Sequence, residues 1–531
     1  MPRFKPLVLI ILDGFGISLE ARDNPVLQAK KPVMDEFDRM FPFTALQASG
    51  PAVGLPWGEA GNSEVGHLTI GSGRIIYHHL PRIISSIRDG SFYQNPAFLK
   101  ARDHVRAHNS RLHIAGLLSS GSVHSYIDHL FPLLEFAKRE NIAPVFVHAF
   151  TDGKDAPPEN GARFLESLCS RMASDWPTAK IASVIGRFYA MDRDEKWDRI
   201  HTAYALMIQG KGEISHSAAE YLRALYAKDI TDEFAPPAMV GGSPEECANS
   251  RIKENDALIF FNYREDSMRE ITHAFTDAAF DKFPREKIPN LFAVTMTEYQ
   301  EDIRAHVAFP PLDITQPLAR VLENAGLKQL HIAETEKYAH VTYFFNGGKE
   351  TLFPGEERVL VPSIATVHFD DVPQMRAEEI TAKILENFGR FDVIIANLAN
   401  ADIVGHTGNF TASIAATEAL DESLGKIANA IFGKEGIMVI TADHGNIELK
   451  RNIATGEKRT QHSLNPVPFY IIGDAFKRSS PRTPEEIKKQ KQEVGGILSD
   501  VAPTIIELLE LIKPEEMTGQ SLLGSLLKQV D

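Results

Sequence analysis

The strongest constraint on the fold is a set of short apolar runs that have no polar face. Residues 7–12 read LVLIIL and stop at Asp13. A strand that is apolar on both faces has to be covered on both sides, which is typical of parallel sheets flanked by helices. Amphipathic stretches of helical length separate these runs, so the sequence predicts an α/β fold. The expected strands are 7–12, 111–117, 144–150, 180–185, 257–261, 291–295, 391–397 and 437–442, and the expected helices are 125–140, 159–173, 195–209, 265–279, 313–325, 376–388, 410–432 and 498–511.

The length of 531 residues exceeds what a single hydrophobic core usually serves. Polar, glycine-rich sequence surrounds residues 71–78, and the segment AFPPLDITQP at 308–317 carries three prolines. Such segments are typical of crossings between domains. We therefore expect one discontinuous domain, residues 1–77 and 312–531, that is interrupted by an inserted domain of residues 78–311.

Charge and composition limit the partners. The net charge of −15 argues against nucleic acid and against an anionic membrane, and a small anionic ligand would require a local reversal of sign. The run at 7–12 is too short to span a membrane and has no cleavage site after it, so we expect a cytoplasmic protein with no membrane partner. The two cysteines, Cys169 and Cys247, form no metal-type pair and are expected as small buried side chains in a reducing compartment.

Acidic residues and histidines recur next to glycines and at the ends of the expected strands. Each motif has an ordinary alternative, because a lone Asp-Gly is usually a turn and a lone Asp-x-x-x-His is usually a surface pair. Their joint occurrence favours a site for divalent metals such as Mn²⁺ or Zn²⁺, which accept carboxylate and imidazole ligands together. The candidate metal ligands are Asp13, Asp402, His406, Asp443, His444 and His462.

Ser63 stands in the segment GEAGNSEVGH at 58–67, which no apolar periodicity explains. Taken alone, the serine would be a helix N-cap. Val65 occupies the position where a Gly-x-Ser-x-Gly nucleophile elbow needs its second glycine, which disfavours a Ser-His-Asp hydrolase. A metal can ionise a serine hydroxyl, and free N–H groups at a helix start bind phosphate. We therefore interpret Ser63 as a candidate nucleophile beside the metals.

The motifs then point to a family. In order along the chain, LDGFG, GNSEVGH, TDGKDAPP, GRFYAMDRDEKWDR, ETEKYAHVTYFFNGG, NLANADIVGHTG, TADHGN and HSLNPVPF resemble the cofactor-independent (2,3-bisphosphoglycerate-independent) phosphoglycerate mutases, and the resemblance extends to MTGQSLL at 517–523. It implies an alkaline phosphatase-like metal-binding domain with an inserted α/β phosphotransferase domain. It also implies an isomerase of glycolysis and gluconeogenesis that interconverts 3-phosphoglycerate and 2-phosphoglycerate.

The resemblance also assigns the metals. It implies two divalent ions, most simply Mn²⁺, and no 2,3-bisphosphoglycerate cofactor. Ser63 would receive the phosphoryl group as phosphoserine and return it to the 2-hydroxyl of glycerate. The implied ligands are Asp402, His406 and His462 for one metal, and Asp13, Ser63, Asp443 and His444 for the other.

Residues of the middle of the chain acquire substrate-binding roles by the same resemblance. His124 would handle the proton of the leaving and attacking hydroxyl, and Lys337 would place a point charge on phosphate. The guanidinium forks suit a carboxylate or a phosphate. The implied substrate-binding residues are His124, Lys154, Asp155, Arg187, Arg193, Arg264 and Lys337.

Three positions depart from the family pattern. The family usually has arginine at the positions of Lys154 and Ser267, and histidine is common at the position of Tyr126. These departures concern the affinity or preference for substrate, whereas the metal set and Ser63 are intact.

Two alternatives stay open at this stage. The first is a metal-dependent phosphomonoester hydrolase on the same fold, which would admit the water that a mutase excludes. The second is a non-catalytic protein that kept the fold, whose expected mark is the loss of metal ligands. The resemblance further suggests a monomer whose partner is a small anionic substrate.

Overall fold

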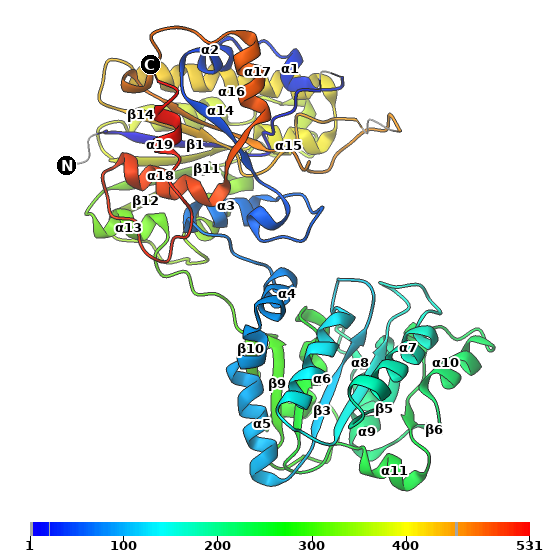
Figure 1. Cartoon of the computed structure of the whole chain (residues 1–531). Helices are drawn as coiled ribbons and strands as arrows, with labels where there is room; N and C mark the ends of the chain where they lie inside the picture. Colours follow the sequence, from blue (N-terminus) through cyan, green and yellow to red (C-terminus); the bar gives the residue numbers. More distant parts are fainter. Residues whose placement is uncertain (1–3, 21, 452–454, 531) are drawn as a thin grey trace. The chain divides into compact units, whose positions relative to one another are not determined.

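The computed structural model describes residues 4–20, 22–451 and 455–530, and it divides into two compact units. The terminal unit comprises Met1–His78 and Leu312–Asp531, and the inserted unit comprises His79–Pro311 (Figure 1). Each unit contains one eight-stranded sheet. The α/β class expected from the apolar runs is therefore confirmed.

The sheet of the terminal unit has the order β12-β11-β13-β1-β14-β15-β2-β16. β1 pairs in parallel with β13 on one side and with β14 on the other. Among the described strands of this sheet, β15 alone runs against the rest. The strands are β1 Leu7–Leu12, β2 Phe43–Gln47, β11 Gln329–Glu334, β12 Glu356–Val361, β13 Val393–Leu398, β14 Ile437–Thr441, β15 Val467–Ile472 and β16 Val494–Ile497.

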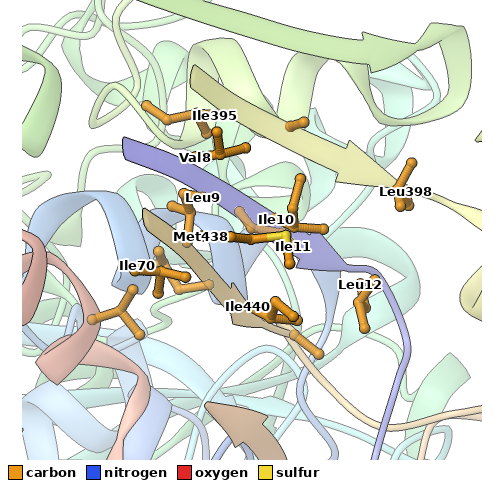
Figure 2. Packing of buried hydrophobic residues seen from close by; sticks show 14 of the residues in the cluster. Val8, Leu9, Ile10, Ile11, Leu12, Ile70, Ile395, Leu398, Met438 and Ile440 are labelled. Carbon is orange, nitrogen blue, oxygen red and sulfur yellow. The ribbon is translucent and has the colours of Figure 1, made fainter. Parts of the chain in front are cut away.

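β1 lies at the centre of the core of the terminal unit. All six of its side chains are buried, as its two-faced apolar sequence predicts. Figure 2 shows the side chains from Val8 to Leu12, with β13, which carries Ile395, on one side of β1 and β14, which carries Met438 and Ile440, on the other. Ile70, on α3, belongs to the same cluster. The strand that ends at Asp13 is therefore fixed from every side.

The sheet of the inserted unit has the order β10-β9-β8-β3-β4-β5-β7-β6. Its strands from β10 to β5 are parallel, and β7 pairs antiparallel with β5. Two hydrophobic clusters cover its two faces, because alternate side chains of β3 enter different clusters. The strands are β3 Leu112–Leu118, β4 Val145–Thr151, β5 Ala179–Gly186, β6 Glu213–Ser215, β7 Ala238–Val240, β8 Ala257–Phe260, β9 Phe292–Thr297 and β10 His306–Phe309.

Helices cover both sheets. In the terminal unit, α14 and α16 pack together on one side of the sheet, whereas α3, α13 and α18 gather on the other (Figure 1). Its helices are α1 Pro25–Gln28, α2 Pro32–Met40, α3 Ser63–Ser72, α13 Leu318–Asn324, α14 Ala377–Glu386, α15 Asn400–Thr407, α16 Phe410–Ile431, α17 Pro484–Gln492, α18 Val501–Leu508 and α19 Leu523–Leu527. Those of the inserted unit are α4 His79–Asp89, α5 Pro96–His108, α6 Leu130–Arg139, α7 Gly161–Asp175, α8 Arg187–Ala190, α9 Trp197–Gln209, α10 Ala218–Tyr226, α11 Pro244–Asn249 and α12 Arg269–Thr276.

The eight expected strands all form, with ends that differ by a few residues at most. Several further strands were not expected. β15 carries Pro468, which weakens its strand signal, and β2 is only five residues long. The expectation for Cys169 is wrong, because this thiol is exposed, whereas Cys247 is buried. Within the described residues, each helix is either too short or too polar to cross a membrane.

Candidate metal centre and substrate pocket

The polar residues singled out in the terminal unit follow the carboxyl ends of neighbouring parallel strands. Asp13 comes directly after β1, and Asp443 follows β14. Asp402 lies in the first turn of α15, shortly after β13, and Lys337 follows β11. Because the carboxyl ends of parallel strands share one edge of the sheet, side chains far apart in the sequence meet there.

Ser63 is the first residue of α3, and its neighbour Asn62 is the cap. The Asn62 side chain accepts a hydrogen bond from the Val65 amide at 3.0 Å, so the N-cap interpretation of Ser63 is wrong. Glycines let this helix approach its surroundings backbone to backbone. A Cβ on Gly66 would lie 2.6 Å from Asp443 Cβ, and one on Gly71 would lie 2.0 Å from the carbonyl oxygen of Phe345. The start of α3 is thereby held against the site.

The structure brings the candidate acidic and histidine ligands together in two groups. In the first, Asp402 Oδ1 lies 3.2 Å from His406 Nε2 and 3.1 Å from His462 Nε2. The second consists of Asp13, Asp443 and His444. One ligand atom from each of these three side chains lies within 4.8 Å of the other two, close enough to share one ion. The two groups adjoin each other, because His444 Nε2 is 4.0 Å from Asp402 Oδ1.

Ser63 and Lys337 join these groups. Ser63 Oγ lies 3.1 Å from Asp13 Oδ1 and 3.1 Å from His444 Nε2. Lys337 Nζ donates to Ser63 Oγ at 2.7 Å and lies 2.7 Å from Asp13 Oδ1 and 2.6 Å from Asp402 Oδ2. The side chains of Ser63, Lys337, Asp13, Asp402 and His444 are buried, whereas His406 is exposed and His462 is half-buried. The serine oxygen therefore contacts a carboxylate, an imidazole and an ammonium group, and the ammonium group also contacts the carboxylate of Asp402.

The pKa values reflect this crowding of charge. Burial and the neighbouring Asp443 raise the pKa of Asp13. Burial opposes the ionisation of Asp402 as well, but Lys337 and His406 outweigh it and hold the pKa of Asp402 well below its usual range. The carboxylates in turn raise the pKa of Lys337 against the effect of burial, so its ammonium group stays charged. The site contains more negative charge than the one lysine balances.

The histidine geometry fits metal binding. The ring Nδ1 of His462 lies 2.7 Å from the carbonyl oxygen of Gly61, and that of His406 lies 2.8 Å from the carbonyl oxygen of Thr460. A carbonyl only accepts, so each neutral ring carries its proton on Nδ1 and presents the Nε2 lone pair. The two Nε2 atoms lie 3.0 Å apart, an arrangement that a shared cation stabilises. Asp443 Oδ2 is buried, makes no hydrogen bond of good geometry with the described residues and lies 3.3 Å from His67 Nδ1.

A further set of buried polar residues surrounds these ligands and was not predicted. His67 Nδ1 lies 2.8 Å from the carbonyl oxygen of Ser63, and Asn397 donates to Asp13 Oδ2 at 2.7 Å. Asn446 donates to Asp402 Oδ1 at 2.9 Å, and Lys450 contacts Asn446. Burial lowers the pKa of Lys450 to about 8. His67 and Asn397 lie inside the motifs GNSEVGH and NLANADIVGHTG, and Asn446 and Lys450 lie inside the polar run TADHGNIELK, but nothing in these motifs indicates which partner each side chain takes.

The inserted unit has its own polar pocket at the corresponding edge of its sheet. The pocket has a volume of about 290 Å³ and follows the carboxyl ends of β3, β4, β5 and β8. Six of the seven predicted substrate-binding residues line it, together with Ser267. Lys337, the seventh, lies in the terminal unit. The six are His124, Lys154, Asp155, Arg187, Arg193 and Arg264.

Arg187 is the most firmly held cation of this pocket. It is buried, and its Nη1 lies 2.7 Å from Asp152 Oδ1 and 2.6 Å from Asp155 Oδ2. Asp152, which was not predicted, also accepts the backbone amides of Lys154 and Asp155. These contacts fix the loop after β4 and one edge of the guanidinium group. By contrast, the side chains of Arg193 and Arg264 are about half exposed and both pair with Asp266.

His124 lies beneath this surface, with 5% of its area exposed. Burial and the charge of Arg187 lower the pKa of His124 to about 4, so its ring is neutral at neutral pH. Ser267 Oγ lies 2.9 Å from His124 Nδ1, and His124 Nε2 lies 3.9 Å from Asp155 Oδ2. Ser267, at a position where the family usually has arginine, therefore orients the ring of His124.

Comparisons with known proteins identify the relatives of this chain. A family model described as "BPG-independent PGAM N-terminus" matches residues 83–301. A protein of Moorella thermoacetica named 2,3-bisphosphoglycerate-independent phosphoglycerate mutase is 46% identical over 98% of this chain and 98% of its own length. A protein of Methanosarcina barkeri named 2,3-bisphosphoglycerate-independent phosphoglycerate mutase 1 is 45% identical over the same shares.

Solved structures agree. A crystal structure of Leishmania mexicana phosphoglycerate mutase, determined at low cobalt concentration, is 32% identical, covers 97% of both chains and has a TM-score of 0.51. The structure of an alkaline phosphatase from the Antarctic bacterium TAB5 also matches, at 10% identity over 97% of this chain and 100% of its own length, with a TM-score of 0.24.

With two largely parallel sheets and polar residues gathered at the carboxyl edge of each, the chain is an α/β enzyme. The relatives match nearly its whole length, and their names agree. The chain belongs to the 2,3-bisphosphoglycerate-independent phosphoglycerate mutase family.

Proposed function

We propose that this chain interconverts 3-phosphoglycerate and 2-phosphoglycerate through a phosphoserine formed on Ser63. The observation that carries the proposal is the position of Ser63 Oγ, which lies within 3.1 Å of Asp13, His444 and Lys337. A hydroxyl placed among these groups is suited to attack a phosphoryl group and to carry it afterwards. The names of the relatives support the substrate.

Two divalent ions, most simply Mn²⁺, complete the proposed site. Asp402, His406 and His462 hold one, and Asp13, Ser63, Asp443 and His444 hold the other. When bound, the ions supply Lewis-acid stabilisation of phosphoryl oxygens and favour the ionised serine. The convergent Nε2 atoms and the excess of buried carboxylates support this assignment. No 2,3-bisphosphoglycerate is required, because Ser63 carries the phosphoryl group between the two hydroxyls.

The residues of the chain divide the remaining tasks. Lys337 donates a hydrogen bond to Ser63 Oγ and balances negative charge at this atom and at the phosphate. His124, neutral at physiological pH, exchanges a proton with the substrate hydroxyl that leaves and later attacks. The cations of the inserted unit bind the anionic groups of the phosphoglycerate, with Arg187 held in advance by Asp152 and Asp155.

The rest of the proposal concerns the setting of the enzyme. Residues 1–77 and 312–531 form the metal-binding, phosphatase-like domain, and residues 78–311 form the substrate-binding phosphotransferase domain. We propose that the protein is a cytoplasmic monomer that acts in glycolysis and gluconeogenesis. The net charge of −15 supports a small-molecule partner rather than nucleic acid.

A coupled assay tests the reaction. The 2-phosphoglycerate formed from 3-phosphoglycerate is measured through enolase, with Mn²⁺ and without 2,3-bisphosphoglycerate, while free phosphate is followed separately. We expect isomerisation with little free phosphate, and loss of turnover in Ser63→Ala. Ser72→Ala, on the same helix, is the matched control and should stay active. Turnover by Ser63→Ala would contradict the phosphoserine, and phosphate release at the rate of isomerisation would indicate a hydrolase.

A further inference from the structure

Lys450 is one of the largest fully buried side chains of the described residues, with 1% of its area exposed. Lysines are almost never fully buried unless they are paired, because removing an ammonium group from water is costly. Lys450 Nζ donates hydrogen bonds to the carbonyl oxygen of Gly405 at 2.8 Å and to Asn446 Oδ1 at 2.5 Å. The buried charge is therefore committed to two specific acceptors.

Both acceptors lead to the first candidate metal group. Gly405 lies in α15 between Asp402 and His406, so Lys450 anchors the helix that carries both side chains. The amide nitrogen of Asn446 also contacts this metal group, since Nδ2 donates a hydrogen bond to Asp402 Oδ1 at 2.9 Å. Because Lys450 occupies the amide oxygen, the amide NH₂ has to face the carboxylate.

Asn446 contacts the same oxygen of Asp402 that faces the two histidines of this group. Asp402 Oδ1 lies 3.2 Å from His406 Nε2 and 3.1 Å from His462 Nε2. Hydrogen bonds to a ligating carboxylate fix its plane, and their loss typically weakens metal binding about 10–100-fold. The contacts of Lys450 thus end on the oxygen that an ion in this group would use.

We propose that Lys450 is a positioning residue for the metal group of Asp402, His406 and His462, acting through Asn446 and through the Gly405 carbonyl. The proposal rests on the proposed function in one respect, namely that this group holds a metal ion. It adds a residue that contacts neither the ion nor the substrate.

The sign of the expected effect follows from two opposing contributions. A buried ammonium group repels a divalent ion, so removal of the charge alone would tighten metal binding. The negative charge of Glu448 opposes the effect of burial on the pKa of Lys450 and so offsets part of the ammonium charge. We therefore expect the loss of positioning to dominate, so that binding weakens.

The test titrates the full-length chain with Mn²⁺ alone and measures free Mn²⁺ by electron paramagnetic resonance. His462→Ala, which removes a ligand, identifies the class of sites that belongs to this group. Lys450→Met should weaken that class about 10-fold and leave the other class unchanged. Asn446→Ala should do the same, and the double variant should weaken binding by less than the product of the two single effects. Lys491→Met is the control, because it removes a lysine paired with Asp38 elsewhere in the terminal unit.

The possible outcomes distinguish a failure of the positioning role of Lys450 from a failure of the proposed function. Unchanged or tighter Mn²⁺ binding by Lys450→Met overturns the positioning role, and so does a loss of thermal stability without a change in affinity. If Lys450→Met lacks the native circular dichroism spectrum, Asn446→Ala decides in its place by the same criterion. Fewer than two Mn²⁺ bound to the unaltered chain contradicts the two-metal site of the proposed function, whereas this result contradicts the positioning role only if His462→Ala removes none of the bound Mn²⁺.

Discussion

The inserted unit should lose stability in mild acid because of one buried histidine. His129 has no exposed surface, and neither ring nitrogen hydrogen-bonds to the described residues. Its ring lies edge-on to Tyr126 and Tyr263, at centroid distances of 5.7 and 5.6 Å. Burial lowers the pKa of His129 to about 3. The substitution His129→Leu removes the titrating group, and it removes no side-chain hydrogen bond to the described residues.

The magnitude follows from linkage between protonation and folding. The unfolded chain binds a proton at His129 near pH 6.5, whereas the folded chain does so only near pH 3. Between these values the unfolded state binds more protons, so stability falls as the pH falls. From pH 7 to pH 5 the cost is about 2 kcal/mol, at about 1.4 kcal/mol for each unit of pH below 6.5. His129→Leu should be spared this loss.

Urea unfolding at pH 7 and pH 5 measures the effect. The chain has three tryptophans, of which Trp57 lies in the terminal unit and Trp176 and Trp197 lie in the inserted unit. In a Trp57→Phe background, fluorescence therefore reports the inserted unit alone. Other groups that titrate in this range affect both proteins equally, so the difference between them isolates His129. An equal loss of unfolding free energy in both proteins would show that His129 does not cause the acid sensitivity.

Two further predictions concern the sites. Arg187→Lys keeps the charge but loses the planar guanidinium group, whose Nη1 contacts Asp152 and Asp155, so KM for phosphoglycerate should rise about 10-fold, or about 1.4 kcal/mol. Arg223→Lys, in a surface pair, is the control, and an unchanged KM of Arg187→Lys would count against the role of the pocket. Gly71→Ala places a Cβ 2.0 Å from the Phe345 carbonyl oxygen and should lower the unfolding free energy of the terminal unit by about 1–3 kcal/mol. Gly524→Ala, whose Cβ meets no atom within 4 Å, should not, and equal effects in urea would contradict the packing argument.

Much of the fold was predictable because its strands are apolar on both faces. LVLIIL at 7–12 becomes the central strand β1, and a polar residue at its end becomes part of the site. Asp13, Asp402 and Asp443 are brought together from distant positions because parallel strands align their carboxyl ends. The acidic residues that the sequence places at strand ends are therefore the ones that the parallel sheet brings together at one edge.

The contacts between side chains were not predictable in the same way. Asn62 and Ser63 are both good capping residues, and only the geometry of α3 shows which one caps. Ser267 is separated from His124 by 143 residues, so nothing in its local sequence indicates the hydrogen bond between them. The same holds for Asp152 and for Lys450, because a buried pairing depends on packing between distant segments.

The close packing of α3 restricts which amino-acid substitutions this protein can accept during evolution. Where a helix packs through side chains, a replacement on one side can be offset by a replacement on the other. At Gly66 and Gly71 the neighbours lie so close that any added side chain has to displace them. Gly66 rests against Asp443 itself, and every single-base change of a glycine codon that alters the residue either adds a side chain or ends the chain. No substitution at these two positions can therefore be accepted in small steps. We expect both glycines to be retained wherever the position of Ser63 relative to the carboxylates is retained.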